Sequence, residues 1–409
     1  MVKKIFTSIL FLGIIPCDAA MFTLFKNPEL GKQIVLILNI TVCGITGIFV
    51  IRDLIKKFFY KEIAAKYLRY FIVLIIFNTL ASMLSAEDAL LDTRTMSLIC
   101  LWAYYSFGLY TFKDAHSLIK TINTTLLMLI VMSIVLYYID YENATHIENA
   151  TTRCFKGVAA NRNSYSEITL FYVASNLYLW AKNKRYSLFY LLTTALAMYT
   201  TYLTHSATST VSMFIMVVLA SYYIIAKKTI SFKAFLIAYI GIFVSLVIIQ
   251  SAEIPFLSEI IEYFRKDNSL TGRTDIWKTS FKLIAEYPIF GRGYDTYALF
   301  KNGVLENDPH NGILYMLLTQ GICGTIIFFS LFCNTLTKAK YILKNNTLFS
   351  YMYIFIIVWM IRGLTESVFS YTHFVFWIAI IIIEMLILEK KKEMSIGEEN
   401  EKKIHEYTF

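Results

Sequence analysis

Charged residues are scarce in this chain. Only 16% of its 409 residues are charged and 57% are hydrophobic, whereas soluble domains are usually about a quarter charged. This composition excludes an ordinary soluble globular protein. The net charge of +9 lies in short loops between apolar runs, so membrane topology explains it better than nucleic-acid binding does. We expect a lipid bilayer as partner and no nucleic acid.

Motifs for metals and nucleotides are missing as well. The six cysteines form no CxxC pair and show no metal-ligand spacing, so neither a disulfide framework nor a zinc site is supported. The sequence has no nucleotide-binding glycine loop and no convincing internal repeat. We therefore expect no cofactor, and any energy for a reaction should arrive in the substrate.

Long apolar runs are abundant instead. Runs of about 18 or more apolar residues are typical of transmembrane helices, and backbone groups in lipid must bond internally, which favours a helical bundle. The alternating strands of a membrane barrel are not present in the sequence. We predict an all-α polytopic bundle of about twelve helices. The predicted spans are roughly 5–25, 34–51, 67–86, 95–112, 121–139, 164–181, 186–204, 208–226, 232–250, 311–336, 349–361 and 368–388.

Lysine and arginine gather in alternate loops if the N-terminus is cytoplasmic. This positive-inside bias predicts that both termini are cytoplasmic. Two outward segments are long, 140–163 and 251–310, and the second precedes the tenth helix and carries seven basic and nine acidic residues. We expect one polytopic membrane domain over 1–388. The tail 389–409 is charged and has no apolar period, which is typical of disorder.

The second outward segment contains a predicted amphipathic helix. Thr271 is expected to cap a helix over about 273–286, and Pro288 ends it. Arg273 at its start would stand beside free amide groups, and together they could cradle a phosphate. A helix lying on the membrane surface is the simpler alternative. The apolar residues form one stripe at helical spacing: Ile276, Trp277, Phe281 and Ile284.

A histidine stands at the mouth of the tenth apolar run. His310 follows Asp308 and precedes Asn311, and imidazole suits general-base work near neutral pH. Asp308 could orient the ring or raise its pKa, whereas an interfacial polar residue is the alternative for His310. Gly321 and Gly324 are expected on the histidine's helix face, where they would let another helix approach closely.

Further polar residues stand near the outer ends of other spans. Arg162 opens the sixth span, where it would face an anionic headgroup or a substrate phosphate, or serve as a plain interfacial anchor. Polar groups near a membrane interior are functional candidates. For Arg362 and Glu366, four residues apart, we favour the interpretation that they pair with each other; His373 follows nearby.

The ordered motifs resemble those of the O-antigen ligase and polymerase superfamily of bacterial inner-membrane glycosyltransferases. The predicted topology is similar too, with twelve spans and a large periplasmic loop before helix ten. The elements that carry the resemblance are Gly272-Arg273-Thr274-Asp275-Ile276-Trp277, then Pro288, Gly291 and Gly293, then His310-Asn311, nine residues, and Gly321-x-x-Gly324.

The resemblance implies an inverting glycosyltransferase that uses neither a metal nor a nucleotide sugar. Such proteins take a glycan from undecaprenyl diphosphate and transfer it to an acceptor hydroxyl at the periplasmic face. His310 would be the general base, and Arg273 would bind the diphosphate and stabilise the leaving charge. The residues implied in substrate binding are Arg162, Arg292, Asn311 and Asp308.

Polymerase and ligase remain two alternatives. Ligases of this family usually carry an arginine near the outer end of helix seven or eight, where this chain has Ala207; Arg162 could supply that charge. The slightly acidic segment 251–310 also suits a phosphorylated lipid A-core acceptor poorly. We therefore favour a polymerase of O-antigen or related repeat units, with a chain-length regulator as a possible partner.

Two other activities must be weighed. A transporter of lipid-linked glycans would also have about twelve helices, but transporters commonly show related halves and charges at mid-depth, which this sequence does not. A protein O-oligosaccharyltransferase shares the motif and differs in its acceptor, which no residue here identifies.

Overall fold

The protein is described here by a computed structural model. It covers residues 114–149, 152–159, 161–249, 269–293, 302–304, 308–369 and 373–407, with isolated residues at 33, 37, 44, 48 and 299. The first four predicted spans lie outside the continuous stretches. The eight later spans all coincide with helices, so the prediction of a mainly helical protein is confirmed, whereas the count of about twelve spans stays a prediction.

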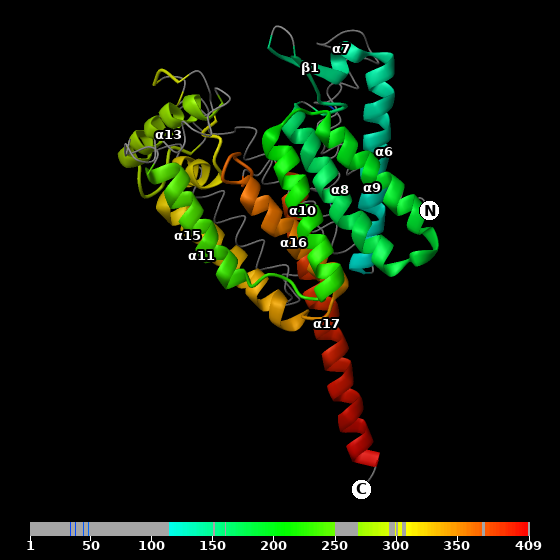
Figure 1. Ribbon diagram of the computed structural model, residues 1–409. Helices are drawn as coiled ribbons and strands as arrows, with labels where there is room; N and C mark the ends of the chain where they lie inside the picture. The colour runs from blue at the N-terminus through cyan, green and yellow to red at the C-terminus, as the bar shows by residue number, and fades with distance from the viewer. Residues whose placement is uncertain are drawn as a thin grey trace.

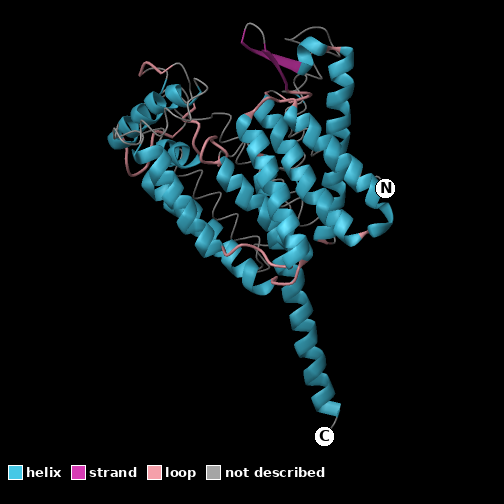
Figure 2. Ribbon diagram, in the orientation of Figure 1, coloured by secondary structure: helices cyan, strands magenta, loops and turns pink. Residues whose placement is uncertain are grey.

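The described helices form a bundle with a small hairpin at one end (Figures 1 and 2). Figure 1 shows α13 and the hairpin at the same end and the C-terminus at the opposite end. The elements are α6 (Ala115–Ile139), α7 (Tyr141–Ala144), β1 (Thr145–Asn149), β2 (Thr152–Phe155), α8 (Arg162–Lys182), the 3₁₀ turn η1 (Lys184–Tyr186), α9 (Ser187–Tyr202), α10 (Ala207–Ala226), α11 (Phe232–Phe243), the π-helical turn η2 (Val244–Ile249), α13 (Ser269–Glu286), α15 (Gly312–Ile342), α16 (Thr347–Arg362) and α17 (Phe374–Tyr407).

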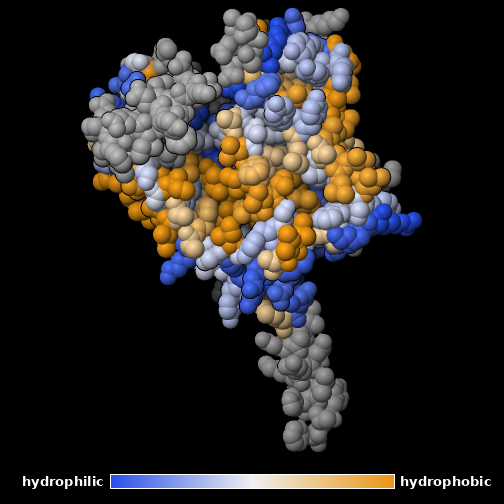
Figure 3. Space-filling model, viewed as in Figure 1, coloured by the Kyte–Doolittle hydropathy of each residue, from blue (hydrophilic) through white to orange (hydrophobic). Residues whose placement is uncertain are grey.

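Membrane-crossing character is clear in part of this bundle. Within the described stretches, α6, α10 and α15 are long and apolar enough to cross a membrane, and α11 and α16 are shorter apolar helices. Figure 3 shows hydrophobic residues across the middle of one face and hydrophilic residues towards both ends. Helices of this length and apolar character are typical of an integral membrane protein.

Short polar side chains start several of these helices. Each of them accepts a hydrogen bond from an amide group that the first helical turn leaves unpaired, which explains where the apolar runs become helical. The capping residues are Asp114 for α6, Asn161 for α8, Ser206 for α10, Asn311 for α15 and Asn346 for α16.

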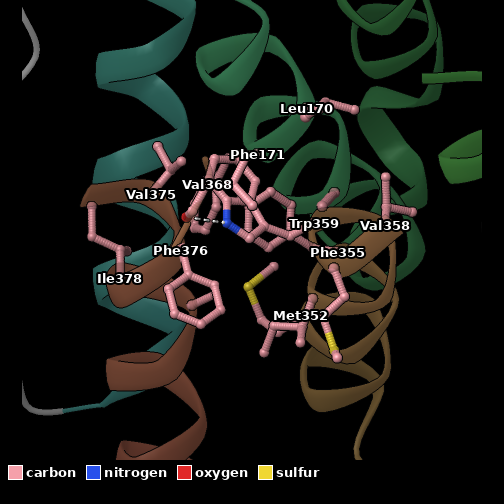
Figure 4. Close-up of a cluster of buried hydrophobic side chains, with 14 of the residues drawn as sticks. Leu170, Phe171, Met352, Phe355, Val358, Trp359, Val368, Val375, Phe376 and Ile378 are labelled. Carbon is pink, nitrogen blue, oxygen red and sulfur yellow. Dashed lines mark hydrogen bonds between the residues drawn. The ribbon is translucent and has the colours of Figure 1, made fainter. Parts of the chain in front are cut away.

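The helix α16 lies at the centre of the bundle and is buried along nearly its whole length. Its side chains pack against α8 and α17, as Figure 4 shows for Phe355 and Trp359 beside Phe171 and Phe376. Trp359 Nε1 donates to the Val368 carbonyl at 3.0 Å, so this buried indole is satisfied. The position of α16 fixes the turn that follows it, where the candidate site begins.

Polar side chains join neighbouring helices inside the bundle. Thr169 and Thr201 share a hydroxyl hydrogen bond of 2.6 Å between α8 and α9. Asn176 Nδ2 of α8 donates to the Tyr190 carbonyl at 2.8 Å and to Thr194 Oγ1 at 2.9 Å, both on α9. Such bonds hold helices together where apolar packing cannot distinguish a neighbouring helix from lipid.

The first long segment predicted to face outward, 140–163, contains a β-hairpin. Between α6 and α8, the strands β1 and β2 pair antiparallel, with His146 opposite Cys154. Cys154 lies in strand β2 and is fully buried. The hairpin is attached to the bundle because Phe155 N donates to the Leu203 carbonyl at 3.1 Å.

The charged C-terminal tail is helical, and the prediction of disorder is wrong. The helix α17 begins at Phe374 and continues to Tyr407, beyond the end of the last predicted span. A helix that already exists lengthens at little cost because only its nucleus is unfavourable. Lys390 and Glu393 pair at 2.9 Å on its surface, which supports the extension.

Candidate active site

The helix that carries Arg273 starts earlier than predicted. The structure begins α13 at Ser269, so Thr271 lies inside the helix and does not cap it. Arg273 is the fifth residue, beyond the amide groups that a helix start leaves free. The predicted cradle of an arginine beside free amides is therefore wrong. The predicted end is confirmed, because α13 stops at Glu286, two residues before Pro288.

The apolar stripe of α13 packs on protein. Ile276 and Trp277 are buried, while Phe281 and Ile284 are partly buried against the core. Trp277 Nε1 donates to the Pro309 carbonyl at 3.0 Å. Packing on the protein therefore accounts for the apolar stripe, and a helix lying only on the membrane surface is not needed to explain it. The same hydrogen bond ties α13 to the segment that contains His310.

Two glycines allow α13 to be fastened to α15. Gly321 interrupts α15 with φ 61° and ψ −169°, so this helix is broken where we expected a continuous face. A Cβ at Gly321 would lie 2.5 Å from Gly291 N. The close approach predicted at Gly321 is confirmed, but the approaching element is the turn after α13. There Arg292 N donates to the Leu318 carbonyl at 2.8 Å, and Ile322 N to the Pro288 carbonyl at 2.8 Å.

His310 lies on a tightly bonded segment just before α15. Its φ is 47°, a left-handed conformation that is uncommon for a residue with a side chain. Asp308 Oδ1 accepts from His310 N at 2.7 Å and also from Ser367 Oγ. Asn311 Oδ1 caps α15, and Asn311 Nδ2 donates to the Leu364 carbonyl at 2.9 Å. Asp308 and Asn311 thus hold the backbone that presents the histidine.

Arg273 and His310 converge on one carboxylate. Glu366 Oε1 is 3.8 Å from a guanidinium nitrogen of Arg273, and Glu366 Oε2 is 3.9 Å from His310 Nδ1. The three side chains are 21%, 26% and 13% exposed for Arg273, His310 and Glu366, so the cluster remains open to a ligand. The two predicted catalytic residues, from α13 and from the start of α15, therefore lie together.

A second layer holds the carboxylate of Glu366. Asn163 Nδ2 donates to Glu366 Oε1 at 3.1 Å, and Ser206 Oγ donates to Asn163 Oδ1 at 2.9 Å. Arg362, buried at 2% exposure, donates to Ser166 Oγ and, at 2.8 Å, to the Asn163 carbonyl. The interpretation that Arg362 pairs directly with Glu366 is wrong, because α16 ends at Arg362 and the chain turns away from helical spacing.

The charges of the cluster shift each other's protonation. Burial alone would lower the pKa of His310, but the Glu366 and Asp308 carboxylates outweigh it and raise this pKa above its usual 6.5, with Arg273 opposing them. Burial would raise the pKa of Glu366, yet His310, Arg362 and Arg273 lower it below the usual 4.5. The site therefore combines an ionised carboxylate with an unusually basic imidazole.

The remaining candidate arginines contact groups outside this cluster. Arg162 places a guanidinium nitrogen 3.3 Å from Cys154 Sγ of the hairpin. Arg292 forms an ion pair of 2.6 Å with Glu286. A further pair joins His373 Nδ1 to Glu167 Oε1 at 2.7 Å. Among the residues that the structure describes, no three His, Cys, Asp or Glu side chains converge to hold a metal ion.

Comparison with known proteins shows what part of this chain is similar to. Residues 192–329 match the family model described as O-antigen ligase. This stretch, less than half of the chain, resembles an O-antigen ligase domain. It extends from α9 into α15 and includes Arg273 and His310, and it ends before Glu366. The resemblance to the superfamily predicted from the motifs is thereby confirmed.

Two curated relatives share short stretches with this chain. An O-antigen ligase of Pseudomonas aeruginosa is 36% identical over 62 residues, 15% of this chain and 16% of the relative. An uncharacterized protein of Haemophilus influenzae is 31% identical over 102 residues, 22% of this chain and 25% of the relative. The matches therefore span a quarter or less of each relative's length.

Sequence reasoning missed the part played by Glu366 and Asn163. Both residues were visible as polar groups near the outer ends of their spans. Only the end of α16 at Arg362 and the entry of α8 at Arg162 bring them together. Their sequence separation of 203 residues carried no signal of this contact.

Proposed function

We propose that the protein is a glycosyltransferase that moves a glycan from undecaprenyl diphosphate to an acceptor hydroxyl at the periplasmic face of the bacterial inner membrane. The observation that supports this most is the meeting of Arg273 and His310 at Glu366, within reach of solvent. A base and a diphosphate-binding cation in one cluster are what glycosyl transfer from a lipid diphosphate requires.

The proposed reaction needs one base and one cation. His310 takes the proton from the acceptor hydroxyl while the hydroxyl oxygen bonds to the anomeric carbon. The bond between that carbon and the diphosphate oxygen breaks, and the diphosphate leaves with the electron pair. Arg273 stabilises the charge that develops there. Attack opposite to the leaving group inverts the anomeric carbon, and no metal or nucleotide sugar takes part.

We favour polymerisation of O-antigen or related repeat units over ligation. Ala207 follows the Ser206 cap of α10, at the position where ligases of this family usually carry an arginine. The Pseudomonas relative is named an O-antigen ligase, which supports transfer to lipid A-core as the second candidate. The cytoplasmic placement of both termini, a chain-length regulator as partner, and substrate contacts by Arg162, Arg292, Asp308 and Asn311 belong to the same proposal.

Complementation of a deletion strain tests this function. The strain receives wild type, His310→Ala or Arg273→Ala, with His146→Ala and Arg185→Ala as matched exposed controls, and its surface polysaccharide is resolved by gel. Core that bears a single repeat unit in both site variants identifies a polymerase. Bare core with accumulated lipid-linked polymer identifies a ligase. Full-length surface polymer in either site variant would contradict the catalytic role of that residue.

A further inference from the structure

The Glu366 carboxylate is divided between two cations. Its oxygens lie 3.8 Å from Arg273 and 3.9 Å from His310, and both distances are longer than a direct hydrogen bond. A shorter contact reaches Oε1 from Asn163 Nδ2, which donates to it at 3.1 Å. Arg273 and His310 therefore share the Glu366 carboxylate.

The carboxylate is also the fixed member of the cluster. Asn163 is held from both sides, by Ser206 Oγ at 2.9 Å on its amide oxygen and by Arg362 at 2.8 Å on its carbonyl. Glu366 is the least exposed of the three charged side chains, at 13%. Arg273 has a longer side chain than Glu366 and is more exposed, at 21%. A ligand can therefore draw the guanidinium away from the carboxylate.

We propose that Glu366 couples binding of the lipid diphosphate at Arg273 to activation of His310. This inference rests on the proposed function and adds a mechanism to it. A diphosphate competes with Glu366 for the guanidinium because both are anions. Once the diphosphate binds the Arg273 guanidinium in place of Glu366, the carboxylate of Glu366 interacts with His310 alone. Glu366 is then a positioning residue that acts through the histidine.

The coupling has a direct chemical consequence. The charged groups that face His310 are Asp308 on its own segment, Glu366 after α16 and Arg273 on α13. A diphosphate bound at Arg273 neutralises a cation that opposes proton uptake by the ring. The proton taken from the acceptor hydroxyl then stays on His310, and the ionised Glu366 balances the imidazolium charge. The base becomes stronger when the donor lipid is in place.

Competition predicts a measurable affinity change. Two ligands that exclude each other from one guanidinium are thermodynamically linked, so removal of the Glu366 charge should tighten diphosphate binding. We expect Glu366→Gln to bind undecaprenyl diphosphate about fivefold more tightly, equivalent to about 1 kcal/mol. A residue needed only to keep the site folded would give weaker binding when substituted.

The experiment uses the full chain in phosphatidylethanolamine and phosphatidylglycerol nanodiscs. Binding of undecaprenyl diphosphate is measured for wild type, Glu366→Gln, Arg273→Ala and the exposed control Glu393→Gln. In parallel, histidine ring signals are titrated by NMR, and the His310 signal is assigned from its loss in His310→Gln. We expect tighter binding and a His310 titration at lower pH in Glu366→Gln, and no change in Glu393→Gln.

The outcomes separate the inference from the proposed function. Equal or weaker binding by Glu366→Gln, with the His310 titration unmoved, overturns the coupling and leaves the glycosyltransferase proposal intact. Binding that Arg273→Ala does not reduce overturns the proposed function and the coupling with it. If Glu366→Gln does not accumulate in membranes, Glu366→Asp replaces it. The shorter carboxylate keeps the charge and retracts it from both cations, so it should change both readouts in the same direction by a smaller amount.

Discussion

The crossing of α15 with the turn after α13 can be tested by adding a single methyl group. Gly321 has φ 61°, and a Cβ there would meet the backbone at Ile289 O and, at 2.5 Å, at Gly291 N. Two other glycines separate the causes. Gly303 has φ 83° with open space around it, and Gly241 lies in α11 with open space and no unusual φ. Alanine therefore adds both backbone strain and a collision at Gly321, backbone strain alone at Gly303, and neither at Gly241.

The expected magnitudes follow from these surroundings. Alanine at Gly241 should stabilise the protein by about 0.5–1 kcal/mol, since glycine weakens a helix interior. Alanine at Gly303 should cost about 1–2 kcal/mol for the left-handed backbone. Alanine at Gly321 adds a collision with backbone atoms that no side-chain rotation relieves, about 1–3 kcal/mol more on top of similar strain. We expect a total of about 4 kcal/mol there.

The assay is thermal unfolding of the purified variants in one detergent at one scan rate, because membrane proteins often unfold irreversibly. At about 2.1 cal/mol/K per residue, the Gly321→Ala variant should unfold about 5 °C below wild type. It should also lose surface polymer, since Arg273 and His310 are carried by the two elements that separate. A Gly321→Ala protein that unfolds like Gly241→Ala and makes full-length polymer would refute this account of the crossing.

Three further predictions concern the same region. Asn311→Ala should destabilise the protein by about 1–3 kcal/mol, because the cap of α15 and a buried bond to the Leu364 carbonyl are both lost; Asn345→Ala, at an exposed position, is the control in the same unfolding assay. Trp277→Phe should cost about 1 kcal/mol by loss of its bond to Pro309 O at 3.0 Å, and a cost near zero would show that this bond does not fasten α13. The kcat/KM of the wild type should fall as pH is lowered through a pKa above 6.5, because His310 must be neutral to act as a base; a limb below pH 6.5 would contradict the influence of the carboxylates.

The helical architecture was predictable because apolar runs in lipid have few alternatives. Backbone groups there must bond internally, and short polar caps such as Asn346 mark where a run becomes a helix. The hairpin β1–β2 and the break at Gly321 were not predictable in the same way. Both depend on contacts with distant backbone, for example Phe155 N to Leu203 O and Ile322 N to Pro288 O, which leave no periodic pattern in the sequence.

The candidate site divides along a similar line. His310 could be selected because an imidazole at the mouth of an apolar run is unusual, and Arg273 because it lies at the start of a predicted amphipathic helix; both residues lie in ordered motifs. The role of Glu366 could not be foreseen from its spacing to Arg362. That spacing favours an ion pair only if the helix continues, and α16 ends at Arg362. The end of α16 therefore determines which charged side chains come together, and sequence alone locates such a helix end only to within a few residues.

The backbone bonds around the site have a mechanical consequence. Gly312 N donates to the Gly363 carbonyl at 2.7 Å, and Trp277 Nε1 donates to the Pro309 carbonyl. These hydrogen bonds connect α13, the start of α15 and the end of α16 into one unit. Transmembrane helices adapt to a thicker or thinner bilayer by changing their tilt. Such tilting should move these elements as one unit, so the spacing of Arg273, His310 and Glu366 should stay the same in membranes of different lipid chain length.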